Sequence, residues 1–347
     1  MRYLLRTCFA AFFLLAAAVL PAQAQSVLPG FGGDRAGTSG FQFLEVPSDA
    51  RSAAMGQSVV TNATDASALF WNPALAAKAP GGQIGAHHTL YYTDVSVDYL
   101  AGFYPVRSLG LTLGGYVQAL NSGEMKETTE FQPFGTGQKF QWVDVAVGLS
   151  VAQSLTDLFS YGLTAKLVRS SVLDLTATTV MADLGFSYRV GDTGISTAVA
   201  IRNFGLDAPF RGDLDRLAPP SSASSGGSTV EVDSYQDLTS PTTFLLGVSY
   251  DVLHNAAPSS DLTISGQLLN PNDNAENLNF GAEYTWNDLL VMRGGYRFSR
   301  GASNWPSLGF GIIAPGLSEA FEARLDYGFN RHNYLGTVHR IGVNVGL

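Results

Sequence analysis

The sequence predicts an all-β protein, a fourteen-stranded antiparallel transmembrane β-barrel with a small N-terminal helical plug. Three observations lead to this fold class. The 347 residues are 46% hydrophobic and only 14% charged, with 38 glycines, which suits a barrel whose outer face meets lipid. After residue 82, apolar and polar residues alternate in about fourteen segments, the period of β-strands. Short and long connections between these segments also alternate, as in outer-membrane barrels.

The first 24 residues indicate a cleaved signal peptide. Arg2 and Arg6 precede an apolar run at 9–20, and Ala22-Gln23-Ala24 forms an A-x-A cleavage site. The apolar run is too short to be a membrane-spanning helix. Cys8 lies before this run, so the mature chain is expected to have no disulfide and no lipid-anchor cysteine.

Residues 25–81 are expected to form a leader and the plug, and residues 82–347 the barrel. Residues 25–40 are rich in glycine and polar residues, which favours a flexible leader. Phe41, Phe43 and Leu44 follow it and are apolar enough to dock the leader against the barrel.

Helix-start residues define the expected plug. Ser48 or Asp49 can cap a short helix that runs through Ala54 and ends at Gly56. Asp65 can cap a second helix at 66–71. Asn72 then precedes Pro73, a cap followed by proline at the first helical position. Inside a barrel, the Asn72 amide is expected to satisfy buried backbone groups.

The expected strand at 321–330, the thirteenth of the barrel, shows the alternation most clearly. One face of the segment 321–330 carries Leu325 and Tyr327, and the other carries Arg324 and Asp326. The other strands are expected near 82–91, 95–105, 109–120, 143–152, 160–169, 180–189, 194–204, 242–252, 261–269, 278–286, 290–298, 307–314 and 340–347. Several segments reach ten residues, the length that a tilted membrane strand needs.

The connections predict which end of the barrel faces outward. Those after even-numbered strands are short, and those after odd-numbered strands include the two longest, 121–141 and 206–241, as well as 170–177. Because outer-membrane barrels have short periplasmic turns and longer outer loops, both chain ends are expected in the periplasm. Residues 219–228 are of low complexity and are expected to be mobile.

The sequence offers no constellation for catalysis or for a cofactor. His87, His88, His254, His332 and His339 have no metal-binding spacing, and adjacent His87 and His88 would face opposite sides of a strand. There is no G-x-S-x-G elbow and no phosphate-binding glycine loop. A net charge of −9 without a basic run excludes nucleic acid as a partner. We therefore expect neither an enzyme nor a cofactor.

Charged residues at inward positions are expected to pair across the lumen and stiffen the barrel, although they could also form a site. They are Asp144, Lys166, Asp183, Arg189, Arg202, Glu283, Arg293, Arg297, Glu322, Arg324 and Asp326.

The stretch FLEVPSDARSAAMGQSVVTNATDASALFWNPA resembles the N-terminal signature of the PorV/PorQ-like outer-membrane proteins, which are related to FadL-type barrels. The matching residues are Phe43, Leu44, Ala50, Arg51, Met55, Gly56, Asp65, Ala66, Trp71, Asn72, Pro73 and Ala74. Thr337, His339 and Arg340 near the end are also similar to that family. The chain departs from the pattern at Gln57, where a second glycine is common, and at the terminal Leu347, where many barrels have an aromatic residue.

The resemblance implies a FadL-like barrel in the outer membrane, surrounded by its lipid. PorV-like proteins belong to the type IX secretion system, where they bind the C-terminal signal domain of secreted cargo together with translocon and attachment proteins. FadL-type proteins instead pass hydrophobic molecules through a plug, so the alternative is a channel with a hydrophobic ligand, lipid or detergent in its lumen. The Asn-Pro-Ala motif is shared by both classes and does not separate them.

Overall fold

The computed structural model describes residues 36–128, 132–212, 237–254, 259–298, 305–315, 322–332 and 336–347. The expected signal peptide at 1–24, the first part of the leader at 25–35 and the low-complexity segment 219–228 lie outside these residues.

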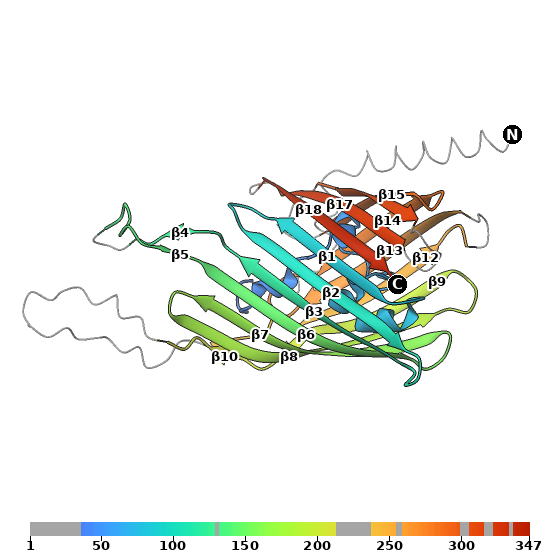
Figure 1. Cartoon of the computed structure of the whole chain (residues 1–347), viewed down its shortest axis with the longest axis horizontal. Helices are drawn as coiled ribbons and strands as arrows, with labels where there is room; N and C mark the ends of the chain where they lie inside the picture. Colours follow the sequence, from blue (N-terminus) through green and yellow to red (C-terminus); the bar gives the residue numbers. More distant parts are fainter. Residues whose placement is uncertain are drawn as a thin grey trace, which may run out of the picture.

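Fourteen antiparallel strands close into one barrel (Figure 1), in which β1 pairs with both β2 and β18. The barrel strands in chain order are β1 (Gln83–Leu90), β2 (Ser96–Val106), β3 (Leu111–Asn121), β6 (Trp142–Ser154), β7 (Phe159–Val172), β8 (Leu175–Arg189), β9 (Ile195–Gly205), β12 (Thr243–Asp251), β13 (Ser260–Pro271), β14 (Asn277–Trp286), β15 (Leu290–Phe298), β16 (Ser307–Pro315), β17 (Glu322–His332) and β18 (Gly336–Gly346). Every strand expected from the alternation is present, and the fourteen-stranded barrel is confirmed.

The alternation separates an apolar outer face from a lumen face of small and polar residues. Leu325 and Val343 point outward and are 45% and 44% exposed, whereas Asp326 and Asn344 are buried in the lumen. An apolar belt around a closed barrel is stable in lipid, because a closed sheet has no edge and pairs its backbone groups between neighbouring strands.

Connection lengths distinguish the two ends of the barrel. The turns at 107–110, 155–158, 190–194 and 287–289 are short and share one end, while 122–141 and 206–242 leave the other. The hairpin β4 (Met125–Lys126) and β5 (Lys139–Phe140) and the pair β10 (Ala208–Pro209) and β11 (Asp237–Leu238) lie in these long connections. We call the end with the long connections the outer end.

The expected long connection at 170–177 is wrong. β7 and β8 continue to Val172 and from Leu175, so only two residues join them. The reason is that Leu175 and Ala177 are buried and Thr176 is bridged to Arg211 in the long connection that follows β9. Packing against that connection extends these two strands beyond their neighbours.

The plug consists of four short helices enclosed by the barrel: η3 (Gln42–Glu45), α2 (Ala50–Ala54), α3 (Ala68–Trp71) and η4 (Pro73–Lys78). The Asp49 side chain caps α2 by accepting a hydrogen bond from Ser52 N at 2.7 Å, as expected. The second helix starts two residues later than expected, because Asp65 Oδ1 accepts from Ser67 N and holds a turn there. None of the helices in the described residues is long and apolar enough to cross a membrane.

Candidate functional site

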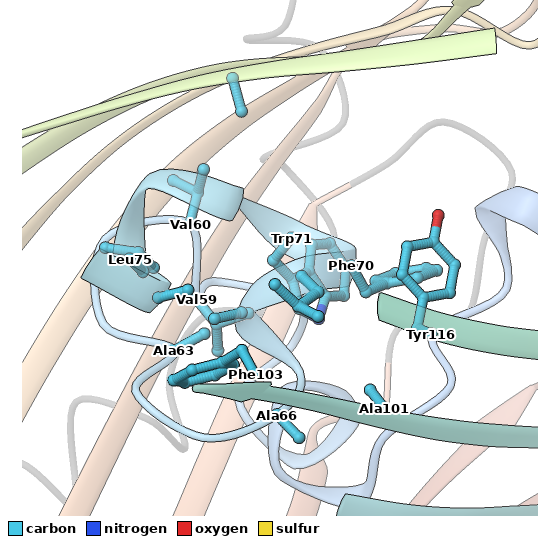
Figure 2. Packing of buried hydrophobic residues seen from close by; sticks show 14 of the residues in the cluster. Val59, Val60, Ala63, Ala66, Phe70, Trp71, Leu75, Ala101, Phe103 and Tyr116 are labelled. Atoms are coloured by element: carbon cyan, nitrogen blue, oxygen red, sulfur yellow. The ribbon is translucent and has the colours of Figure 1, made fainter. Parts of the chain in front are cut away.

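The hydrophobic core of the molecule lies between plug and wall. Phe70 and Trp71 of α3 are buried in one cluster with Tyr116 of β3 (Figure 2), and Leu69 of α3 and Tyr99 of β2 belong to the same cluster. The Phe70 ring lies edge-on to Trp71 and Tyr99, at centroid distances of 5.1 and 6.0 Å. This burial of large apolar side chains provides the main force that holds the plug in the lumen.

Glycines on the lumen face of the wall let the plug approach the strands closely. A Cβ atom at Gly185 of β8 would collide with Asn72 Oδ1, and one at Gly295 of β15 with the backbone of Met55 and Gly56. The lumen glycines that lie in this way against plug atoms are Gly85, Gly114, Gly162, Gly185, Gly247, Gly281, Gly295, Gly309 and Gly328. Plug backbone lies directly against the wall at Gly162, Gly281, Gly295 and Gly328, and plug side chains fill the space at the other glycines.

Asn72 joins three segments, as expected for a buried amide. Its Nδ2 donates to Val60 O at 3.0 Å and to Phe186 O of β8 at 3.2 Å, while its Oδ1 accepts from Ala74 N at 3.1 Å. Pro73 occupies the first position of η4, where its fixed φ suits a helix start.

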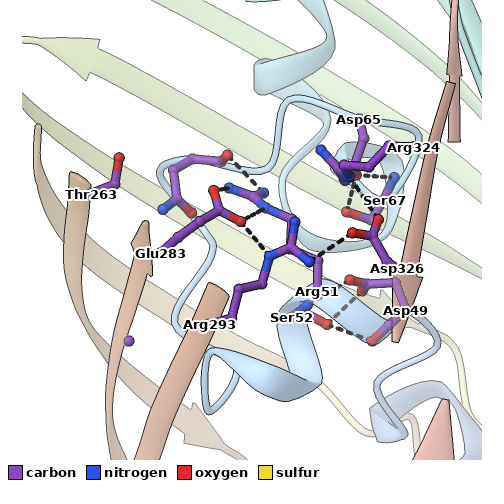
Figure 3. A network of polar contacts seen from close by, with 12 residues as sticks. Asp49, Arg51, Ser52, Asp65, Ser67, Thr263, Glu283, Arg293, Arg324 and Asp326 are labelled. Atoms are coloured by element: carbon purple, nitrogen blue, oxygen red, sulfur yellow. Dashed lines mark hydrogen bonds and ion pairs between the residues drawn. The ribbon is translucent and has the colours of Figure 1, made fainter. Parts of the chain in front are cut away.

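An ionic network fastens the other half of the plug (Figure 3). Arg51 of α2 donates from Nε and Nη2 to the two carboxylate oxygens of Glu283, each at 2.8 Å. Arg293 bridges Glu283 and Asp326, at 2.5 and 2.7 Å. Arg324 binds Asp326 at 2.7 Å and also pairs with Asp65 of the plug. Each charged side chain of this network therefore has a partner of opposite charge, which offsets the cost of burying it.

The carboxyl group of Asp65 stays ionised in this network. Burial acts to raise its pKa, but the guanidinium groups of Arg324 and Arg51 outweigh burial and hold the pKa well below its usual value. Asp65 therefore binds the wall residue Arg324 in addition to shaping the turn before α3.

The residues of the plug motif fall together in this interface. Ala50, Arg51, Met55 and Gly56 lie on or directly after α2, and Ala66, Trp71 and Ala74 are buried beneath β2 and β7. Trp71 Nε1 donates to Asp49 Oδ2 at 3.0 Å, which ties the two halves of the plug. The motif therefore forms one packed unit with the wall.

A cavity of about 630 Å³ lies above the plug at the outer end. We call it the outer cavity. Its floor is formed by residues from Ser39 to Pro47, a segment that includes η3, together with Gly56 and Gln57. One side of the outer cavity is apolar. The opposite side carries arginines, among them Arg297 and Arg340. The apolar residues of the first side are Leu120, Trp142, Phe210 and Leu238.

Glu45 is the half-buried acid of the cavity floor. Thr243 Oγ1 donates to its Oε1 at 3.0 Å. Burial raises the pKa of Glu45 to about 7, and the charge of nearby Asp273 adds to this shift. A carboxyl group that titrates near neutral pH thus helps to dock η3 against the wall, in addition to buried Phe41, Phe43 and Leu44.

Most of the expected inward charges do line the lumen, and several pair there, for example Lys166 with Asp183 at 2.6 Å. Arg189 and Glu322 are exposed instead, because they lie where β8 ends and β17 begins. Sequence reasoning missed the role of Arg202, whose guanidinium stacks 3.8 Å from the centre of the Phe70 ring and donates to Leu44 O. Among the described residues, no group of three metal-binding side chains is present.

No family model and no curated protein matches the chain. Solved structures share its fold. The toluene transporter TbuX of Ralstonia pickettii has a TM-score of 0.56 at 14% identity and covers 89% of this chain and 98% of its own. The toluene transporter TodX of Pseudomonas putida has a TM-score of 0.55 at 12% identity, covering 86% and 96%. The CymD monoaromatic hydrocarbon channel has a TM-score of 0.55 at 13% identity, covering 87% and 98%.

The chain has a FadL-like fold, a closed barrel of fourteen strands around an N-terminal helical plug. With its apolar outer belt, this barrel is an outer-membrane protein.

Proposed function

We propose that the barrel is an outer-membrane channel that admits small hydrophobic or amphipathic molecules. The observation that carries this proposal is the outer cavity. It is large enough for a small ligand, partly apolar, and closed below by the leader and plug. The shared fold with structures described as toluene transporters and a hydrocarbon channel adds support.

Toluene accumulation in intact cells tests the proposal. Trp142 and Phe210 face each other at 6.3 Å between ring centroids on the apolar side of the cavity. Replacing Phe210 with Asp should reduce accumulation several-fold relative to the native barrel. Phe134→Asp is the matched control, because Phe134 is 98% exposed and lies away from the cavity. Accumulation no faster than in cells without the barrel would contradict a channel for such molecules.

A second candidate is a partner-binding barrel of the type IX secretion system, favoured by the resemblance of the plug motif to the PorV/PorQ pattern. Arg51, Asp65 and Asn72 each make hydrogen bonds or ion pairs that hold the plug. This structural role explains their presence in the motif, so the motif is compatible with either function. Affinity isolation in mild detergent separates the two. Recovery of translocon components, attachment proteins or secreted cargo would favour secretion, and toluene accumulation without such partners would favour the channel.

A further inference from the structure

The arginine side of the outer cavity holds guanidinium groups that have no acidic partner. Arg297 on β15 lines the cavity and makes no hydrogen bond or ion pair with any described residue. Arg340 on β18 also lines it and is only 3% exposed. Arg340 donates from Nε to Pro47 O at 3.0 Å and from Nη1 to Asn330 Oδ1 at 2.5 Å, and neither acceptor is charged. Burying a guanidinium group without a counter-charge is costly.

The plug network shows the contrast. Its three arginines, Arg51, Arg293 and Arg324, each bind carboxylate groups of the plug or the wall. The chain therefore supplies acids where arginines hold the plug, and it supplies none to Arg297 and Arg340 at the cavity.

These two guanidinium groups lie close to each other and to one tyrosine. The charge of Arg297 acts on Arg340, and the phenol group of Tyr91 interacts electrostatically with both. Tyr91 lines the cavity, and its hydroxyl has no hydrogen-bond partner among the described residues. We call Tyr91, Arg297 and Arg340 the arginine site. Its hydrogen-bond donors carry two positive charges, a combination that suits an anion with several oxygens.

Two acids occur among the described residues of the cavity lining, and neither pairs with the arginine site. Glu45 on the floor accepts a hydrogen bond from Thr243 Oγ1 at 3.0 Å. With a pKa of about 7, Glu45 carries only part of a negative charge at neutral pH. Asp144 lies on β6, where its Oδ1 accepts from Trp142 Nε1 at 2.7 Å. Most of the positive charge of the arginine site is therefore left for a ligand to balance.

We propose that the outer cavity binds an amphipathic phosphate monoester, with its phosphate group in the arginine site and its apolar chain toward Trp142 and Phe210. The proposal rests on the proposed channel function and names the class of ligand. A phosphate monoester carries about −1.5 to −2 charges at pH 7 and presents three acceptor oxygens, so it can balance both guanidinium groups. A carboxylate carries one charge and balances only one of them.

The shape of the cavity lets one molecule reach both sides. Arg297 on β15 and Trp142 on β6 lie half-way around the ring of strands from each other. Both line the same cavity of about 630 Å³. The phosphate group and the chain of one ligand can therefore occupy the two sides at once.

Binding of octyl phosphate to the purified barrel in an uncharged detergent at pH 7 tests the proposal. Tryptophan fluorescence can report binding, because Trp142 and Trp305 line the cavity. Octyl phosphate should bind at least about tenfold more tightly than nonanoate or octanol, because charge-assisted hydrogen bonds to the second guanidinium group are lost with these two ligands.

Arg297→Gln should weaken the binding of octyl phosphate by about tenfold or more. The substitution breaks no bond of the unliganded barrel, so heat-modifiable migration should persist. Arg169→Gln is the matched control, since it removes the same charge from β7 at an exposed position that does not line the cavity.

Three outcomes would overturn the proposal. Equal affinity of the Arg297→Gln and Arg169→Gln barrels for octyl phosphate would exclude the arginine site. Equal affinity for octyl phosphate and nonanoate would exclude a doubly charged head group. Inorganic phosphate that binds as tightly as octyl phosphate would exclude a role for the apolar side.

The binding test is independent of toluene. If octyl phosphate binds as expected but the native barrel accumulates no toluene, the proposed channel function fails and the phosphate site remains. If toluene accumulates but octyl phosphate binds no better than octanol, the ligand class fails and the channel remains.

Discussion

Gln57 adopts a backbone conformation that suits glycine. Its φ is +69° and follows Gly56 at +62°, so two successive residues lie in the left-handed region. A side chain raises the energy of that region by about 1–2 kcal/mol. The PorV/PorQ-like pattern, which this stretch resembles, often has a second glycine here. The left-handed conformation of the turn explains that preference.

Gln57→Gly should therefore raise the free energy of unfolding by about 1 kcal/mol, because the left-handed strain disappears. Denaturant unfolding in detergent measures the change. Gly56→Ala is the opposite case: its Cβ would lie 2.8 Å from Tyr296 N, and stability should fall. Equal stability of Gln57→Gly and the native protein would show that the turn relaxes without cost.

Glu45 should make stability depend on pH. Its pKa is about 7 when folded and 4.5 when unfolded, so between these values the folded state holds a proton that the unfolded state has lost. The free energy of unfolding should thus fall as pH rises through this window, by at most about 3 kcal/mol. Glu45→Gln should flatten the dependence in unfolding curves measured from pH 4 to 8. An unchanged slope in that variant would assign the effect to another group.

At the level of single elements, Asn72 is expected to be a main anchor of the plug, because it bonds both the plug and the wall strand β8. Asn72→Leu would leave Val60 O, Phe186 O and Ala74 N without the partners they have now. Each lost partner costs about 1–3 kcal/mol when buried. We expect faster proteolysis of residues 42–78 while heat-modifiable migration of the barrel persists. Asn121→Leu serves as the control, since the Asn121 side chain accepts a hydrogen bond from Gly123 N of the connection that follows β3 and not from the plug. Equal proteolysis of both variants would contradict an anchoring role.

The elements themselves were largely predictable, but their contacts were not. Asp49 and Pro73 mark helix starts through local chemistry, so the sequence reveals them. The bond between Arg51 and Glu283 joins residues 232 positions apart, and it exists because the barrel closes around the plug. No local pattern distinguishes Gly185, which meets Asn72, from Gly266, which meets an outward-facing ring of its own wall.

At the level of the whole molecule, period-two alternation predicted the barrel well because lipid and lumen demand opposite side chains on each strand. It failed at 170–177, where two strands extend further than expected and one of them is bridged to another connection. The alternation predicts which face of a strand meets lipid and which meets the lumen. It does not predict where a long connection packs against a strand end.

The orientation of the barrel is open to direct measurement. An epitope inserted after Phe134, in the long connection between β3 and β6, should bind antibody on intact cells. The same epitope inserted after Gly191, in the short turn between β8 and β9, should bind only after the outer membrane is permeabilised. The reverse pattern would invert the barrel and place the outer cavity in the periplasm.

The close fit between plug and wall glycines has a consequence for the order of assembly. Residues 42–78 precede every strand in the chain, yet Gly295 and Gly328, near its other end, touch the backbone of Gly56 and Ala50. A segment enclosed without clearance cannot be threaded into a finished cylinder. We therefore expect the pairing of β1 with β18, the first and last strands, to be the last event of assembly, around a plug that is already in place. A chain that closed this seam early would exclude its own plug and stay an open pore.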